Sequence, residues 1–140
     1  GETVTSVELL HYIKRRHPDC FQTGVAFNQY EPAAPEQDKL RRKLDAGADF
    51  VITQPVIAPD PVIDLLVREL PIPVHLEAWM SPKIELLNEC IGCEVGSPDG
   101  FEPIGALRTL ETHYPDQSFY LAVLNFAKQF DQVIHPGVRA

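Results

Sequence analysis

Apolar residues recur along this chain with two alternating spacings. Segment 5–17 places Val7, Leu10 and Ile13 three residues apart, the period of an amphipathic helix. Segment 50–54 is short and almost continuously apolar, which is typical of a strand covered on both faces. The pattern predicts helices at 5–17, 36–46, 60 or 61 to 70, 81–92, 101–113 and 126–134. Between them it predicts strands at 21–27, 50–54, 72–78 and 119–124, with a further candidate strand at 93–95. A Pro-rich loop is predicted at 28–35.

The order of these elements predicts an α/β fold. Strands that alternate with helices of roughly ten residues form right-handed βαβ units and a parallel sheet. Two architectures fit: half of a (β/α)8 TIM-type barrel, or a small open doubly wound sheet. A complete barrel needs roughly 200 to 250 residues, whereas this chain has 140. We therefore expect residues 1–140 to form a single α/β domain.

Composition and charge exclude several classes of function. The net charge is −8, no basic face recurs along the chain and the basic cluster at 39–43 is local, so a general nucleic-acid binder is not expected. No apolar run approaches the ~20 residues of a membrane span. Three cysteines, an odd number, argue against a disulfide framework and for a reducing, cytoplasmic location.

Gln54 is the sharpest candidate for a ligand contact. It stands at the C-terminal tip of a predicted strand, which is where parallel α/β proteins bind their substrates. A side-chain amide both donates and accepts hydrogen bonds and can therefore bind a planar heterocycle. The alternative, to which we give equal weight, is that Gln54 is a solvated strand end without a function.

His75 and Glu77 share one face of their predicted strand, because alternate side chains point the same way. The other face is aliphatic and must meet helices, so these two side chains would point into a barrel. A buried carboxylate there could act as an acid or base with a raised pKa. The alternative, which we favour slightly, is that His75 and Glu77 form a structural pair and satisfy each other's hydrogen-bonding groups.

Cys90 and Cys93 have the CxxC spacing of redox and zinc sites, but their context fits neither. Cys90 ends a predicted helix, where the dipole disfavours a thiolate, and the second pair of ligands that structural zinc needs is missing. Buried structural thiols are the favoured interpretation, and no metal site is predicted. Glycine-rich phosphate loops and Ser-centred elbows are also missing from the sequence.

Basic residues gather on the helix predicted at 36–46. Arg42 and Lys43 lie toward its end and could reach a phosphate or ribose across the mouth of the sheet. An ordinary solvated helix face is the commoner explanation for such a run.

The segments around Gln54 resemble the methylenetetrahydrofolate reductase family. Members have a strand that ends in an aromatic residue, a loop with Pro and Glu, a helix that ends K-x-D-A-G-A and a strand that ends I-T-Q. The corresponding segments here are 25–27 (VAF), 28–32 (NQYEP), 43–48 (KLDAGA) and 52–54 (ITQ). The likeness spans the chain and becomes less clear toward the C-terminus.

The resemblance implies a (β/α)8 barrel that holds FAD, of which this chain would be the C-terminal half. It implies that Gln54 contacts the folate pterin or the nicotinamide on the flavin face. Phe27 stands where the family usually has a tyrosine against FAD, and Arg42 and Lys43 would lie on the ribose and diphosphate side. The implied cofactor contacts are Phe27, Glu36, Lys39, Arg42 and Lys43.

The function implied is part of a flavin-dependent reductase that transfers a hydride from NAD(P)H through FAD to a folate one-carbon unit. The catalytic glutamate belongs to the family's first half, so no catalytic residue is assigned here and the chain alone is expected to be inactive. The expected partners are a folate-type molecule, NAD(P)H and the missing N-terminal half. The alternative is a non-catalytic half-barrel module that associates, with itself or another chain, through its exposed sheet edge.

Overall fold

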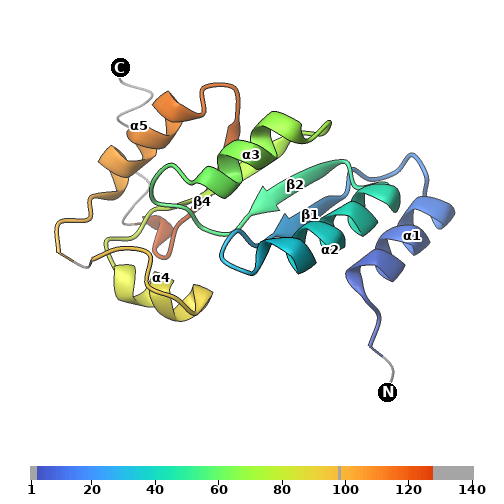
Figure 1. Cartoon of the computed structure of the whole chain (residues 1–140), viewed down its shortest axis with the longest axis horizontal. Coiled ribbons are helices and arrows are strands. Elements are labelled where there is room, and N and C mark those ends of the chain that lie inside the picture. The colour runs from blue at the N-terminus through green and yellow to red at the C-terminus, as the bar shows by residue number, and fades with distance from the viewer. Residues whose placement is uncertain (1–2, 98, 128–140) are drawn as a thin grey trace. The chain divides into compact units, whose positions relative to one another are not determined.

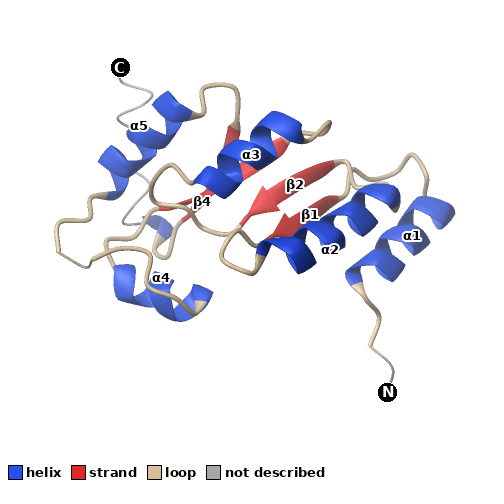
Figure 2. Cartoon of the chain, in the orientation of Figure 1, coloured by secondary structure: helices blue, strands red, loops and turns tan. Residues whose placement is uncertain are grey.

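The chain adopts an α/β fold in which helices and strands alternate (Figures 1 and 2). A computed structural model describes residues 3–97 and 99–127. Its elements are α1 (Ser6–Arg16), β1 (Gly24–Phe27), α2 (Ala33–Asp45), β2 (Phe50–Thr53), α3 (Pro61–Glu69), β3 (Val74–Trp79), α4 (Ile84–Ile91), α5 (Pro103–His113) and β4 (Ser118–Ala122).

Most predicted elements are confirmed, although several begin or end up to three residues from their predicted bounds. Helix α2 begins at Ala33 inside the expected loop, because Pro35 in the first turn lacks only an N–H that has no helical partner there. Residues 93–95 do not form a strand: Cys93 lies in a bend, and residues 94 and 95 have no regular secondary structure. The helix expected at 126–134 falls mostly outside the described residues.

The chain divides into two compact units, Gly1–Gln54 with Pro61–His75 and Pro55–Asp60 with Leu76–Ala140. Each unit is described by itself. The prediction of one α/β domain that forms the C-terminal half of a larger barrel stays a prediction.

The first unit builds a parallel sheet from β1, β2 and the start of β3. Gly24 pairs with Phe50 at one end of the β1–β2 ladder and Phe27 with Thr53 at the other. β3 joins β2 in parallel, with Val51 opposite Val74. Helices α1 and α2 lie side by side, and α2 and α3 run in front of the strands in Figure 2.

Side chains alternate between two faces of these strands. The face toward the helices is buried, and its members include Val25, Phe27, Val51, Thr53 and Val74. On the opposite face Ala26 is exposed, whereas Ile52 is half-buried. Segment 50–54 was expected to be covered on both faces, and the described residues cover one face fully and the other in part.

The second unit contains the rest of β3, helices α4 and α5, and β4. Trp79, Ile84 and Leu87 form its buried cluster. The Met80 N–H donates to the Ala122 carbonyl at 3.1 Å, which joins the end of β3 to the end of β4.

The strand order is β1-β2-β3-β4, the same as the order along the chain. A doubly wound sheet reverses its order at a switch point, whereas a (β/α)8 barrel keeps chain order. The sheet is therefore consistent with part of a TIM-type barrel, and the described strands show no reversal of a doubly wound kind.

Candidate functional site

Gln54 stands immediately after β2, at the C-terminal tip predicted for it. Its N–H donates to the Phe27 carbonyl at 3.1 Å and to Gln29 Oε1 at 3.0 Å. Its carbonyl accepts from Gln29 Nε2 and from Thr53 Oγ1, both at 2.9 Å. The peptide groups of Gln54 are thus fixed from three sides.

The side chain of Gln54 is half-buried. Its side-chain amide makes no hydrogen bond within residues 3–97 and 99–127. A fixed backbone with an uncommitted amide is the arrangement that a ligand contact requires, since the amide can bind without first breaking a bond.

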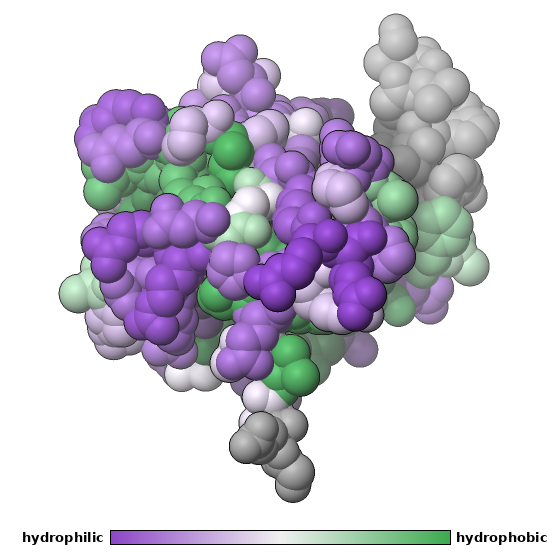
Figure 3. All heavy atoms as spheres, turned by 90° about the vertical axis from the view of Figure 1, so that its right-hand side faces the viewer, coloured by the Kyte–Doolittle hydropathy of each residue, from purple (hydrophilic) through white to green (hydrophobic). Residues whose placement is uncertain are grey.

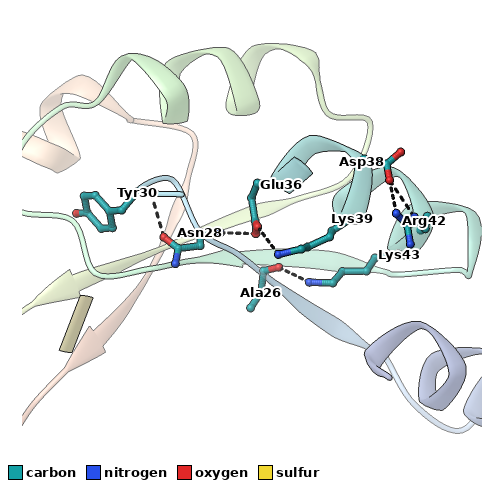
Figure 4. Close-up of polar contacts among 8 residues, drawn as sticks. All are labelled: Ala26, Asn28, Tyr30, Glu36, Asp38, Lys39, Arg42 and Lys43. Atoms are coloured by element: carbon teal, nitrogen blue, oxygen red, sulfur yellow. Dashed lines mark hydrogen bonds and ion pairs between the residues drawn. The ribbon is translucent and has the colours of Figure 1, made fainter. Parts of the chain in front are cut away.

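The loop after β1 is held by Glu36, which is only 6% exposed. Glu36 Oε1 accepts from the Asn28 N–H at 2.9 Å, and Asn28 Oδ1 accepts from the Tyr30 N–H at 3.0 Å (Figure 4). A carboxylate that accepts a backbone N–H makes one of the stronger hydrogen bonds in proteins. The loop that carries Gln29 is therefore fixed at its first residue.

The basic side chains of α2 point in two directions. Lys39 Nζ lies 3.4 Å from Glu36 Oε2, and Lys43 Nζ donates to the Ala26 carbonyl at 2.8 Å (Figure 4). Arg42 instead pairs with Asp38, to which its Nε donates at 3.0 Å. The structure thus brings Glu36, Lys39 and Lys43 to the β1 side of α2, but it does not bring Arg42 there.

Phe27 is the least accessible of the predicted site residues. Its side chain is 2% exposed and lies with Leu40, Leu44 and Leu66 along the groove between α2 and α3. Its contact with FAD stays a prediction. In this structure the Phe27 ring is buried on the face of β1 that is covered by the helices.

Asp49 ties α1 to the strand layer just before β2. Its Oδ2 accepts from Lys14 Nζ at 2.6 Å and from the Thr23 N–H at 2.7 Å. The Lys14 hydrogen bond, followed by that from Thr23, lowers the pKa of the Asp49 carboxyl. This contact secures the start of the strand whose other end presents Gln54.

His75 and Glu77 are half-buried on the face of β3 opposite its buried positions, as expected. The His75 ring packs edge-on against Phe50, with 5.0 Å between centroids. Burial raises the pKa of the Glu77 carboxyl. An acid or base role for these residues stays a prediction.

The interpretation of Cys90 and Cys93 as buried thiols is wrong, because both are exposed. The inward positions of α4 are Ile84 and Leu87, which leaves Cys90 on the outer side of the helix. Within the described residues, no three potential His, Cys, Asp or Glu ligands are placed to hold a metal ion. No helix among those residues is both long enough and apolar enough to cross a bilayer.

Sequence reasoning missed Gln29 and Asp49. Both act through partners more than 20 residues away along the chain. The only local signal is that Asp49 directly precedes a strand and Gln29 lies between Asn28 and Tyr30 in a loop. Neither signal identifies a partner.

Comparison with known proteins supports the resemblance. Residues 1–68 match the sequence model of the family described as methylenetetrahydrofolate reductase. The curated protein "Methylenetetrahydrofolate reductase 2" of Saccharomyces cerevisiae (strain ATCC 204508 / S288c) is 41% identical over 54 residues, which covers 34% of this chain and 9% of that protein. The chain therefore resembles this family over its first half, and the match spans less than a tenth of the length of that relative.

Proposed function

We propose that this chain is part of a flavin-dependent reductase of the methylenetetrahydrofolate reductase type. The intact enzyme would transfer a hydride from NAD(P)H through FAD to the one-carbon unit of a folate. The observation that carries the proposal is Gln54, whose backbone is fixed at a strand tip while its side-chain amide makes no hydrogen bond to the described residues. It lies within the part of the chain that matches the family.

In this proposal the chain's own residues bind and orient, and bound FAD supplies the hydride chemistry. Gln54 would hydrogen-bond the pterin or the nicotinamide and hold the reacting ring in line with the flavin. Orientation of this kind accelerates a transfer because the entropy of alignment is lost on binding and not in the transition state.

The residues implied for FAD fit a diphosphate in part. The Lys39 side chain is 59% exposed, and the Lys43 ammonium lies at the outer side of β1, so both could balance phosphate charge. Glu36 would support the cofactor through Lys39 and the loop, since both of its oxygens already have partners. Arg42 would have to leave Asp38 to reach a phosphate.

The absorption spectrum of the intact protein, purified from its own cells, tests this proposal. We expect flavin bands and the release of FAD on denaturation. A colourless protein that releases no flavin would contradict the proposal. The 140-residue chain alone should not turn over methylenetetrahydrofolate, and turnover by it would refute the claim that the acid and much of the flavin pocket lie elsewhere.

A non-catalytic module is the second candidate, and the outer edge of β1 favours it. The carbonyls of Thr23 and Phe27 accept from the β2 side. Because backbone groups alternate along a strand, those of Gly24 and Ala26 face outward, and Lys43 reaches the Ala26 carbonyl there. In the part of the sheet that the structure describes, β1 is an edge strand, and edge strands template association.

A groove of about 280 Å³ runs along this edge beneath α1. Its walls include Leu9, Leu10 and Ile13 of α1, and Leu9 is 51% exposed. Figure 3 shows the face on which α1 lies, where hydrophobic side chains appear between hydrophilic ones. Colourless protein that elutes as a dimer would favour the module, and yellow protein would favour the enzyme.

A further inference from the structure

Gln29 is a glutamine buried to 6% exposure in the loop between β1 and α2. Both ends of its side-chain amide bond the backbone of one residue, Gln54. Oε1 accepts from the Gln54 N–H at 3.0 Å, and Nε2 donates to the Gln54 carbonyl at 2.9 Å. The pair is reciprocal, as two peptide groups are across a sheet.

This pairing continues the β1–β2 ladder by one residue. The backbone register ends with Phe27 opposite Thr53. At the next position of β2 the side chain of Gln29 takes the place of a neighbouring strand. The φ and ψ angles of Gln54 are thereby restrained, and with them the direction in which its side chain leaves the sheet.

Loss of the Gln29 amide would not leave the Gln54 peptide without partners. The Gln54 N–H also donates to the Phe27 carbonyl, and the Gln54 carbonyl also accepts from Thr53 Oγ1. The second set of bonds supports the fold, whereas the Gln29 amide adds a restraint on orientation. A chain with Gln29 replaced by an apolar residue of similar size should therefore still fold.

We propose that Gln29 is a positioning residue that sets the Gln54 side chain for ligand recognition. This inference rests on the proposed function, in which Gln54 binds a pterin or nicotinamide ring. Glu36 helps to hold Gln29 in place, because Glu36 accepts a hydrogen bond from the N–H of Asn28, the residue that precedes Gln29. Recognition thus depends on two glutamines from neighbouring strand tips, of which one touches the ligand.

The test uses the intact protein with folic acid as the probe, by calorimetry, together with amide hydrogen exchange at Gln54 followed by mass spectrometry. Gln54→Leu removes the contact itself, and Gln29→Leu removes the amide that bonds the Gln54 backbone. Gln37→Leu, on the exposed surface of α2, is the matched control. We expect Gln29→Leu to weaken binding by about tenfold and to accelerate exchange at Gln54, while the control changes neither.

Gln29→Glu provides a signature that a purely structural role would not give. An ionised carboxylate accepts from the Gln54 N–H but repels the Gln54 carbonyl, whereas a protonated one also donates to it. Binding by this variant should therefore recover, relative to the unaltered chain, as the pH falls through the pKa of the new carboxyl.

The outcomes separate the two claims. Suppose that Gln54→Leu abolishes binding, whereas Gln29→Leu changes neither binding nor amide exchange at Gln54. This result would overturn the role of Gln29 and leave the proposed function standing. Failure of the unaltered intact protein to bind folic acid would count against the proposed function. The exchange rates would then decide alone: acceleration in Gln29→Leu that Gln29→Glu reverses at low pH supports positioning, and an unchanged rate refutes it.

Discussion

Removing the Glu36 carboxylate should destabilise the first unit through one hydrogen bond. Glu36 is 6% exposed, and its Oε1 accepts from the Asn28 N–H at 2.9 Å. Glu36→Leu leaves this donor without its partner, which costs about 1–3 kcal/mol. The Lys39 contact adds little, because its distance is 3.4 Å and the Lys39 side chain is 59% exposed.

Three variants separate these contributions. Glu36→Leu should lower the free energy of unfolding by about 2 kcal/mol. Glu36→Gln keeps an acceptor for the Asn28 N–H and should lose less than about 1 kcal/mol. Lys39→Ala should lose less than about 0.5 kcal/mol, as an exposed ion pair does.

Urea unfolding followed by far-UV circular dichroism is the assay. The only tryptophan, Trp79, belongs to the second unit, so its fluorescence would not report on this site. With a slope of about 2 kcal/mol per molar urea, Glu36→Leu should shift the midpoint by about 1 M. A shift for Lys39→Ala as large as that for Glu36→Leu would refute the reasoning, because the ion pair and not the loop bond would then dominate.

Three further changes test other parts of the structure by the same unfolding assay. Asp49→Asn should lower the free energy of unfolding by about 1 kcal/mol at neutral pH. The folded pKa of Asp49 is lowered, so its stabilisation is present above the unfolded pKa near 3.8 and is lost as the pH falls through the folded pKa. Equal stability of the variant and the unaltered chain at pH 7 would count against the Lys14 contact. Glu77→Gln should stabilise the chain at pH 7 but not below the ordinary carboxyl pKa near 4.5. Burial raises the folded pKa of Glu77, so the unaltered chain loses stability as the pH rises through that folded pKa. A variant that is less stable than the unaltered chain at pH 7 would contradict this prediction. Gly47→Ala should cost about 1 kcal/mol because Gly47 has a φ of +98°, and a gain in stability would show that the turn after α2 tolerates a side chain.

Local patterns in the sequence were sufficient to predict most of the fold. The spacing of Val7, Leu10 and Ile13 predicted α1, and the apolar run before Gln54 predicted β2 and its polar tip. Alternation along β3 correctly placed His75 and Glu77 on one face. These features depend on neighbours within a few residues, which a sequence displays directly.

Contacts between distant segments could not be predicted in this way. Gln29 reaches Gln54 and Asp49 reaches Lys14 only after the strands have paired. The start of α2 was misplaced because Pro35 resembles a loop residue until its position in the first turn is known. The exposure of Cys90 depends on how α4 packs against the rest of its unit, where Ile84 and Leu87 are the buried residues of the helix.

The two half-reactions of the intact protein test the central claim most directly. Under anaerobic conditions, NAD(P)H is added first and methylenetetrahydrofolate second, while the flavin absorbance is followed. We predict that the flavin bands bleach on the first addition and return on the second. Bands that NAD(P)H leaves unchanged, or that stay bleached after the folate is added, would contradict the assignment of this chain to a folate reductase.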